Sequence, residues 1–185
     1  MNRLGIIGAT TWGTTLAIIG AREGIEISLL VRSSEEADKL KEDRENRRLV
    51  PGFLFPHNVI ITEHPSEALA NADAIIFAVP SPSLRINARK VKTQINDQSV
   101  VVSAVKGLEV GTSKRMSQIL EEELYGVASD RICALSGPNL AGEIVQGKPS
   151  STVVASTNEK SSKLVQTLLT SSHMRVYTNP DIIGV

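Results

Sequence analysis

Residues Leu4–Gly13, which read LGIIGATTWG, give the strongest indication of the fold of this chain. Its apolar first half, Leu4–Ile7, predicts a strand that ends at a glycine. Apolar side chains then recur at helical spacing from Trp12 to Arg22, and Glu26–Val31 predicts a second strand. The order strand, glycine-rich turn, helix, strand over about 28 residues is typical of two parallel strands joined by a crossover helix.

The turn Gly8–Gly13 has a form that holds a dinucleotide pyrophosphate. Gly8 permits the tight bend, and Gly13 lets the helix pack closely on the strand. The phosphates then lie on free backbone N–H groups at the start of the helix. Thr10 stands where the middle glycine of G-x-G-x-x-G is usual, and its Cβ is expected to crowd the phosphates. We therefore predict cofactor binding at Gly8, Thr10 and Gly13; the alternative is a tight turn with a structural role alone.

The rest of the chain keeps the same alternation of apolar runs and amphipathic stretches. Further strands are predicted at 59–62, 74–79, 99–105, 132–135, 152–155 and 175–177. Helices are predicted at 65–70 and at 82–93, and from a Ser33–Ser34 cap to Asp43. A further helix is predicted after a cap at Thr112 or Ser113, and another starts at Asn158. A short helix with Pro138 in its first turn is predicted to run through Glu143. These repeated units predict an α/β fold of the Rossmann type, a doubly wound, mainly parallel sheet with helices on both faces.

The residue that ends the second predicted strand bears on which dinucleotide binds. An Asp or Glu at this position accepts a hydrogen bond from the 2′-hydroxyl of the adenosine ribose. The chain has Arg32 there, followed by Ser33 and Ser34. Because a guanidinium and hydroxyls bind a 2′-phosphate that a carboxylate would repel, NADPH is favoured, with NADH also accepted. The alternative is an Arg32 side chain that points into solvent and pairs with Glu35 or Glu36.

Ligands of such folds bind at the carboxyl ends of the parallel strands. Three of these ends carry unusual residues, namely Val79-Pro80-Ser81, Lys106-Gly107 and Ser136-Gly137-Pro138-Asn139. Lys106 closes an apolar strand, where its ammonium is placed to bind a phosphate or carboxylate. The stretch from Ser136 to Asn139 is expected to open a helix and to offer backbone N–H groups to a second polar contact. The alternatives are a surface lysine and a simple helix cap.

Composition limits the class of ligand. Lys plus Arg equals Asp plus Glu at 20 each, so binding of nucleic acid or of an anionic membrane is not expected. The three histidines have no ligand spacing, so no metal site is expected. Cys133 lies in an apolar run and is expected to be a buried thiol in a reducing compartment. No apolar stretch reaches the roughly 20 residues that span a bilayer, and no signal-peptide pattern is present, so a cytoplasmic location is expected.

In their order along the chain, these motifs resemble the N-terminal domain of bacterial NAD(P)-dependent glycerol-3-phosphate dehydrogenases over essentially all of its length. The motifs are Gly8 through Thr14, with a marked Trp12-Gly13-Thr14; Arg44 through Arg48 with Pro51-Gly52 and Pro56; Val79-Pro80-Ser81; Lys106-Gly107; Ser136-Gly137-Pro138 with Ala141 and Glu143; and Tyr177-Thr178-Asn179 with Asp181 through Val185. The resemblance implies oxidation of sn-glycerol 3-phosphate to dihydroxyacetone phosphate, or the reverse reduction that feeds phospholipid synthesis, with NAD or NADP as cofactor.

The resemblance also implies roles for individual residues. The residues expected to contact or lie near the cofactor are Thr11, Trp12, Arg32, Lys106 and Ala141. The residues expected at the substrate are Lys106, Gly137 and Asn139. The chain departs from the family's pattern at Thr10, where a glycine is usual, and at Leu49, where a tyrosine near the cofactor is common.

Residues 181–185 resemble the start of a helical domain that, in the family, supplies the catalytic lysine and further phosphate ligands. The resemblance thus divides the chain into a dinucleotide-binding domain at 1–180 and the first residues of that second domain at 181–185. It places the proton acceptor beyond Val185 and assigns no catalytic residue before it. We expect these 185 residues alone to bind cofactor and to turn over little or no substrate, and the full-length protein to form a homodimer.

Three alternatives remain open from the sequence. The first is a related domain of the 6-phosphogluconate or ketopantoate dehydrogenase type, against which Trp12-Gly13-Thr14 and Ser136-Gly137-Pro138 count. The second is a non-catalytic module that senses a dinucleotide and regulates a partner. The third is a Rossmann-like scaffold without a ligand, which Thr10 makes more credible.

Overall fold

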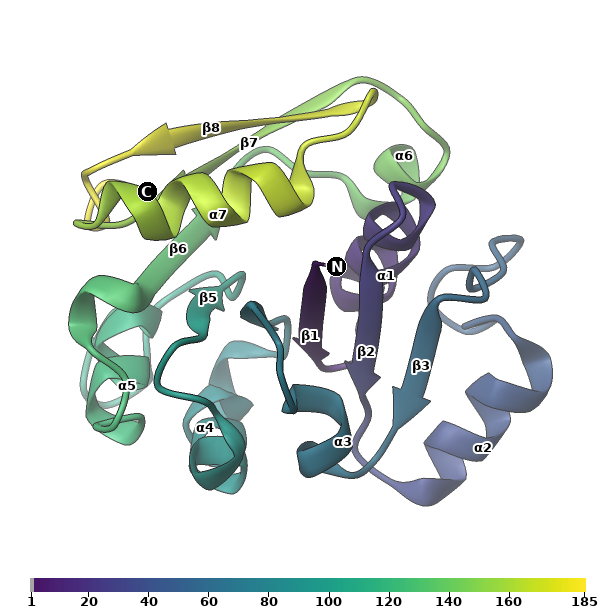
Figure 1. The fold of residues 1–185 in the computed structure, drawn as a ribbon, viewed down its shortest axis with the longest axis horizontal. Helices are drawn as coiled ribbons and strands as arrows, with labels where there is room; N and C mark the ends of the chain where they lie inside the picture. The colour runs from purple at the N-terminus through teal and green to yellow at the C-terminus, as the bar shows by residue number, and fades with distance from the viewer. Residues whose placement is uncertain (1) are drawn as a thin grey trace.

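The strands and helices follow one another in near-strict alternation in the computed structural model, which describes residues 2–185 (Figure 1). The strands are β1 (Arg3–Ile7), β2 (Glu26–Leu30), β3 (Val59–Thr62), β4 (Ala74–Phe77), β5 (Val100–Ser103), β6 (Ile132–Ser136), β7 (Ser150–Ala155) and β8 (Met174–Asn179). The α-helices are α1 (Thr11–Arg22), α2 (Ser34–Asp43), α3 (Pro65–Leu69), α4 (Leu84–Val91), α5 (Met116–Glu123), α6 (Ala141–Val145) and α7 (Glu159–Leu169). Short 3-10 turns lie at Ser81–Ser83, Lys92–Gln94 and Ser129–Arg131.

One sheet contains all eight strands, in the order β3-β2-β1-β4-β5-β6-β7-β8. The strands β1 to β6 are mutually parallel, whereas β7 is antiparallel to β6 and β8 is parallel to β7. This confirms the predicted mainly parallel, doubly wound sheet. The chain builds outward from β1 through β2 to β3 and then returns to place β4 on the other side of β1. The switch point therefore lies between β1 and β4, where folds of this kind bind ligands.

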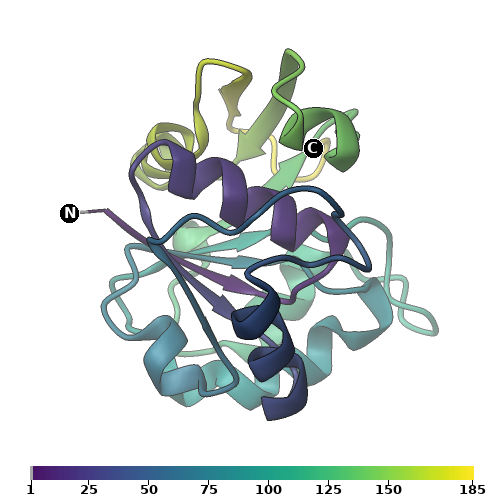
Figure 2. The same ribbon diagram turned by 90° about the vertical axis from the view of Figure 1, so that its right-hand side faces the viewer.

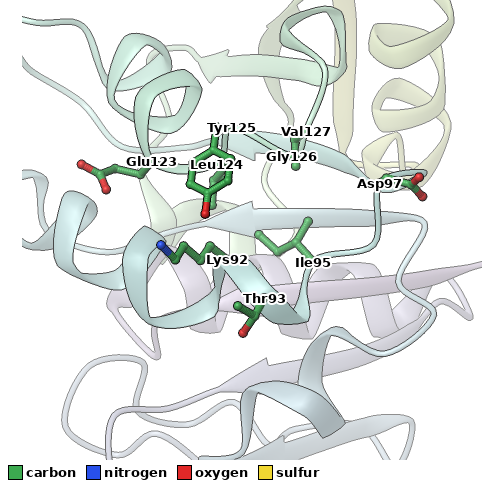
Figure 3. A pocket seen from close by; sticks show the side chains of 9 residues that line it. All are labelled: Lys92, Thr93, Ile95, Asp97, Glu123, Leu124, Tyr125, Gly126 and Val127. Carbon is green, nitrogen blue, oxygen red and sulfur yellow. The ribbon is translucent and has the colours of Figure 1, made fainter.

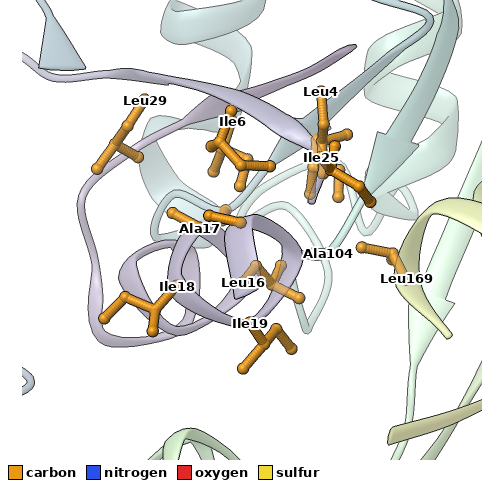
Figure 4. Close-up of a cluster of buried hydrophobic side chains, with 14 of the residues drawn as sticks. Leu4, Ile6, Leu16, Ala17, Ile18, Ile19, Ile25, Leu29, Ala104 and Leu169 are labelled. Carbon is orange, nitrogen blue, oxygen red and sulfur yellow. The ribbon is translucent and has the colours of Figure 1, made fainter. Parts of the chain in front are cut away.

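Helices cover both faces of the sheet (Figure 2) because successive strand residues point to opposite sides. On one face, Leu4 and Ile6 of β1 lie against Leu16 of α1, in an apolar cluster that continues to α7 (Figure 4). On the other face, Ile75 and Phe77 of β4 belong to a second cluster with apolar residues of α3, α4 and α5. All four residues of β4 are buried. Burial of one large apolar side chain contributes about 1.5–3 kcal/mol, so these two layers hold the central strands in place.

The helix after β5 does not begin as predicted. It starts at Met116 with Arg115 as its N-cap, not at Thr112 or Ser113. The Thr112 hydroxyl instead donates to Glu109 at 2.6 Å, and Ser113 has a left-handed φ of 55°. These residues form a tight loop before the helix, so the helix-capping prediction at Thr112 or Ser113 was wrong.

The stretch after β6 does not open a helix either. Helix α6 begins at Ala141, three residues after Pro138, so the expectation that Pro138 lies in a first helical turn was wrong. The backbone N–H of Asn139 donates to the Gly137 carbonyl at 2.8 Å, and the Asn139 side-chain amide donates to the Ser151 carbonyl of β7 at 3.0 Å. The stretch is therefore a turn tied to the neighbouring strand rather than the N-terminus of a helix.

Cys133 lies in β6 and is fully buried, as its apolar surroundings predicted. Burial raises the pKa of its thiol to about 12, a rise that a hydrogen bond with Ser156 partly offsets. The thiol is thus a core side chain and not a nucleophile. No helix within residues 2–185 has the length and apolarity needed to cross a bilayer.

Candidate functional site

The turn between β1 and α1 is held by the contact of two glycines. The N–H of Gly8 donates to the carbonyl of Leu30 at 2.9 Å, and Gly8 has a φ of +106°, which favours glycine. A Cβ on Gly13 would lie 2.0 Å from the Gly8 carbonyl oxygen. Both glycines are therefore required for α1 to start this close to the end of β1. The first turn of α1 presents its N–H groups at the switch point of the sheet.

Thr10 is the N-cap of α1 and also ties the turn to β4. Its hydroxyl accepts from the Gly13 N–H at 3.1 Å and donates to the Ala78 carbonyl at 2.6 Å. Its φ of −70° is ordinary for a residue with a side chain. The hydroxyl that replaces the usual middle glycine therefore has a structural role that sequence reasoning did not assign to it.

Asn46 fixes the same turn from a distant part of the chain. It lies in the irregular segment between α2 and β3 and is 5% exposed. Its side-chain amide donates to the Ala9 carbonyl at 3.1 Å and to the Thr14 hydroxyl at 2.9 Å. Sequence reasoning placed Asn46 only in the Arg44–Arg48 motif and gave it no role. The one feature of the sequence that could have indicated this role is the presence of a polar residue inside a long connection between two predicted elements.

A cavity of about 390 Å³ opens beside the turn. Its walls come from the ends of β1, β2 and β4, from α2 and α4, and from the segment that carries Asn46. Among the lining residues are Gly8, Thr10, Arg32, Glu36, Arg48, Leu49, Pro80 and Lys90. A second cavity of about 570 Å³ runs along α2 and shares Arg32, Glu36 and Arg48 with the first. The structure thus brings three predicted residues, Gly8, Thr10 and Arg32, to one hollow.

Arg32 does not stand free at the end of β2. Its Nε lies 3.5 Å from Oε2 of Glu36, and its own backbone N–H donates to that oxygen at 3.2 Å. The arginine side chain is 77% exposed. The side chain thus has the exposure and the pairing with Glu36 that the alternative interpretation of Arg32 described, and its role toward a cofactor stays a prediction.

Lys106 and Gly137, two residues predicted for the substrate site, lie in contact. The Lys106 ammonium donates to the Gly137 carbonyl at 2.8 Å and joins the ends of β5 and β6. A cavity of about 310 Å³ at these strand ends is lined by Lys106 and Ser136 and by residues 182, 183 and 185. The Asn139 side-chain amide donates to the Ser151 carbonyl of β7, so no direct bond between Asn139 and Lys106 is formed.

The remaining predicted residues lie on α1 and α6. Thr11 begins α1, and Trp12 is half-buried and packs against the apolar cluster. Ala141 begins α6, and its carbonyl accepts from the Thr15 hydroxyl at 3.5 Å. A shorter bond, from the Arg22 guanidinium to the Val145 carbonyl at 2.7 Å, holds α6 against α1. The structure therefore places Ala141 beside the helix whose start forms the turn.

Salt bridges anchor the loop that follows Lys106. The Arg85 guanidinium of α4 donates to both carboxylate oxygens of Glu109, at 2.6 and 2.7 Å, and also pairs with Glu122 and Glu123 of α5. The pKa of Glu109 falls to about 2 because Arg85 and then Thr112 donate to the carboxylate. The pKa of Arg85 is raised by its hydrogen bonds to the carboxylates of Glu109, Glu123 and Glu122.

Another hollow is lined by residues 92, 93, 95, 97 and 123–127, near the amino ends of β5 and β6 (Figure 3). It precedes β5 and β6, whereas the candidate site follows them. Lys92 there lies over the ring of Tyr125, with its ammonium 5.3 Å from the ring centre. Within residues 2–185, no group of three or more His, Cys, Asp or Glu side chains is placed to hold a metal ion.

A glycine-paired turn at the start of a helix, at the switch point of a parallel sheet and beside a cavity, defines a dinucleotide-binding domain of the Rossmann type. The family model described as the N-terminus of NAD-dependent glycerol-3-phosphate dehydrogenase matches residues 3–162, and the chain belongs to this family. The resemblance predicted from the motifs is confirmed, and the related 6-phosphogluconate and ketopantoate types are set aside.

Relatives and solved structures agree with this membership. Glycerol-3-phosphate dehydrogenase [NAD(P)+] of Dehalococcoides mccartyi is 43% identical over an alignment of 186 positions, which covers 100% of this chain and 52% of the relative. The enzyme of the same name from Corynebacterium diphtheriae is 38% identical over 98% of this chain and 55% of the relative. The crystal structure of glycerol-3-phosphate dehydrogenase from Coxiella burnetii superposes with a TM-score of 0.91 at 30% identity, over 99% of this chain and 55% of that one. The chain spans about half the length of the curated relatives it matches.

Proposed function

We propose that this chain binds NAD or NADP along the carboxyl edge of its sheet, with the pyrophosphate at the turn Gly8–Gly13. The close contact of Gly8 and Gly13 carries this proposal, because it brings the first N–H groups of α1 to the switch point of the sheet. The adenosine half of the cofactor occupies the cavity beside Arg32, and the nicotinamide half runs toward the ends of β4 and β5.

Individual roles follow from the family resemblance. The residues proposed to contact the cofactor are Gly8, Thr10, Thr11, Trp12, Gly13, Arg32, Lys106 and Ala141. The residues proposed to bind the substrate are Lys106, Gly137 and Asn139. The contact between Lys106 and the Gly137 carbonyl supports a shared role for these two, since an incoming phosphate would be a stronger partner for the ammonium than a neutral carbonyl.

The chain serves, in this proposal, as the cofactor-binding part of an oxidoreductase that interconverts sn-glycerol 3-phosphate and dihydroxyacetone phosphate. A hydride passes between the secondary carbon of the alcohol and the nicotinamide, and the hydroxyl proton passes to a base. Lys106 orients the phosphate substrate, and the resemblance assigns the base to the family's helical domain. On their own, residues 1–185 are proposed to bind cofactor without measurable turnover.

Two further expectations remain proposals. We propose a cytoplasmic location, supported by the reduced, buried Cys133. We also propose a homodimer for the full-length protein, supported by the exposed apolar side chains of Leu108, Val110 and Leu140. Light scattering on the full-length protein measures the dimer directly.

Calorimetric titration of the purified chain with NADH and with NADPH tests the proposal. We expect saturable binding of at least one, accompanied by a change in the fluorescence of the lone tryptophan, Trp12. Absence of binding of either at millimolar concentration would refute it. Oxidation of glycerol 3-phosphate by the chain alone is expected to be undetectable, and robust turnover would show that the proton acceptor lies within it.

A further inference from the structure

The carboxylate of Glu36 lies beside the end of β2, and the spacing of the sequence motifs gave it no role in binding a cofactor. Glu36 lies in the first turn of α2, four residues past Arg32, and its side chain folds back to the end of the strand. One oxygen, Oε2, accepts from the Arg32 backbone N–H at 3.2 Å and lies 3.5 Å from the Arg32 Nε. The Glu36 N–H in turn donates to the Ser33 hydroxyl at 3.3 Å. The carboxylate is therefore anchored at the position where Rossmann-type domains read the adenosine ribose.

Glu36 and Arg32 differ in how firmly they are held. The Glu36 side chain is 21% exposed, whereas the Arg32 side chain is 77% exposed. Both line the cavity beside the turn and the adjoining cavity along α2. An incoming ribose therefore meets a carboxylate that is held by the strand-end N–H and an arginine side chain that lies mostly in solvent. Arg32 can leave the site at little cost because a solvent-exposed ion pair contributes little.

The surrounding charges are closely balanced and so leave the choice of cofactor to the residues at the strand end. The cations that line the two cavities besides Arg32 are Lys39, Arg47, Arg48 and Lys90, and the anions besides Glu36 are Glu35, Asp43 and Glu45. Arg47 is itself paired with Asp43 at 3.2 Å and with Glu45 at 3.6 Å. The basic excess over the whole region is small.

We propose that Glu36 is a residue that determines cofactor specificity, by accepting a hydrogen bond from the ribose 2′-hydroxyl of NAD(H) and by repelling the 2′-phosphate of NADP(H). A carboxylate accepts from hydroxyls but has no donor for a phosphate. This inference rests on the proposed dinucleotide site. It modifies the interpretation of the strand end based on Arg32 alone, since the guanidinium that would bind the phosphate lies 3.5 Å from a carboxylate that would repel it.

The substitution Glu36→Gln tests this inference on the chain as it is. The amide keeps the size of the side chain and removes its charge, so NADPH is expected to bind more tightly and NADH less tightly. The ratio of the two dissociation constants is expected to shift by about tenfold toward NADPH, the effect of one hydrogen bond to a charged group. The matched control is Glu42→Gln, an exposed carboxylate on the same helix that lines neither cavity, for which the ratio should stay at the wild-type value.

The ratio separates a ribose contact from a purely structural role. If Glu36 only stabilised the start of α2 through the Arg32 N–H, both affinities would change by the same factor, and that result would overturn the inference. If Glu36→Gln does not fold, as judged by circular dichroism, Glu36→Asp is measured instead. This retracts the carboxylate by one methylene and is expected to move the ratio in the same direction by a smaller factor; an unchanged ratio counts against the inference. Binding of neither cofactor by the wild type overturns the proposed function and the inference together, whereas normal binding with an unchanged ratio overturns the inference alone.

Discussion

The carbonyl oxygen of Gly8 lies so close to Gly13 that a Cβ on Gly13 would be 2.0 Å from it. Real Cβ atoms do not approach a backbone oxygen to that distance, so a side chain at position 13 must push α1 away from β1. The turn cannot keep its shape with any residue other than glycine there. The proposed pyrophosphate site depends on that shape.

Gly13→Ala is therefore expected to destabilise the chain and to abolish cofactor binding. Overpacking of this kind costs about 1–3 kcal/mol in the free energy of unfolding, measured by urea titration. Gly142→Ala is the control, since a Cβ on that glycine of α6 meets nothing within 4 Å. It should leave the stability within about 1 kcal/mol of the wild type, on the stabilising side. Normal cofactor affinity in Gly13→Ala would mean that the turn is not the pyrophosphate site.

Asn46→Ala should weaken both cofactors by the same factor. The substitution leaves the Ala9 carbonyl and the Thr14 hydroxyl without their buried donor, at a cost of about 1–3 kcal/mol in the free energy of unfolding. Arg47→Ala changes the exposed neighbour in the same segment and should cost less than about 1 kcal/mol. Equal stability losses at the two positions would show that Asn46 does not hold the turn.

Thr10→Val tests the role of the threonine that replaces the usual glycine. Valine keeps the shape but removes the hydroxyl that bonds Gly13 and Ala78, so a loss of about 1–2 kcal/mol in the free energy of unfolding is expected. Thr10→Ser keeps the hydroxyl and should retain most of the stability. Thermal unfolding of the two variants side by side gives the comparison. A serine variant as unstable as the valine variant would assign the effect to the methyl group instead.

The strands and the glycine turn could be predicted because their signals are local. An apolar run such as Ala74–Phe77 needs burial on both faces, and the Gly8–Gly13 spacing needs only a strand before it and a helix after it. The positions at which two helices begin, near Thr112 and near Pro138, could not be predicted from local signals. The Thr112 hydroxyl bonds Glu109 instead of capping a helix, and the turn after Pro138 is tied to a strand more than ten residues away.

The candidate site was predictable at its strand ends and not around them. Lys106 and Gly137 were expected at one edge of the sheet because the ends of parallel strands meet there, and they are in contact. Asn46 reaches backbone and side-chain groups 37 and 32 positions earlier in the chain, so no spacing rule indicates it. Glu36 was considered only as a solvent partner of Arg32, because the fold of its side chain back onto the strand end depends on the cap at Ser33.

The Arg85–Glu109 pair should make the free energy of unfolding depend on pH in the acidic range. The folded-state pKa of Glu109 is lowered to about 2 by its hydrogen bonds from Arg85 and Thr112. A carboxylate with a depressed pKa stabilises the fold above its unfolded pKa of roughly 4.3, and the stabilisation is lost as pH falls from there toward 2. The pKa values of Glu122 and Glu123 are also lowered, by Lys114 with Arg85 and by Arg89 with Arg85. The chain is thus expected to lose unfolding free energy steeply between about pH 4.5 and pH 2.

Arg85→Gln should reduce the loss of unfolding free energy at low pH, since it removes the donor shared by the three carboxylates. The variant should be less stable than the wild type at pH 7 and closer to it in stability at pH 3. Urea titrations across the pH range give both quantities. Arg175→Gln is the control, because that guanidinium lies over the ring of Tyr177 rather than among carboxylates, and its pH profile should run parallel to the wild type. Parallel profiles for Arg85→Gln and the wild type would mean that the cluster does not stabilise the loop after Lys106.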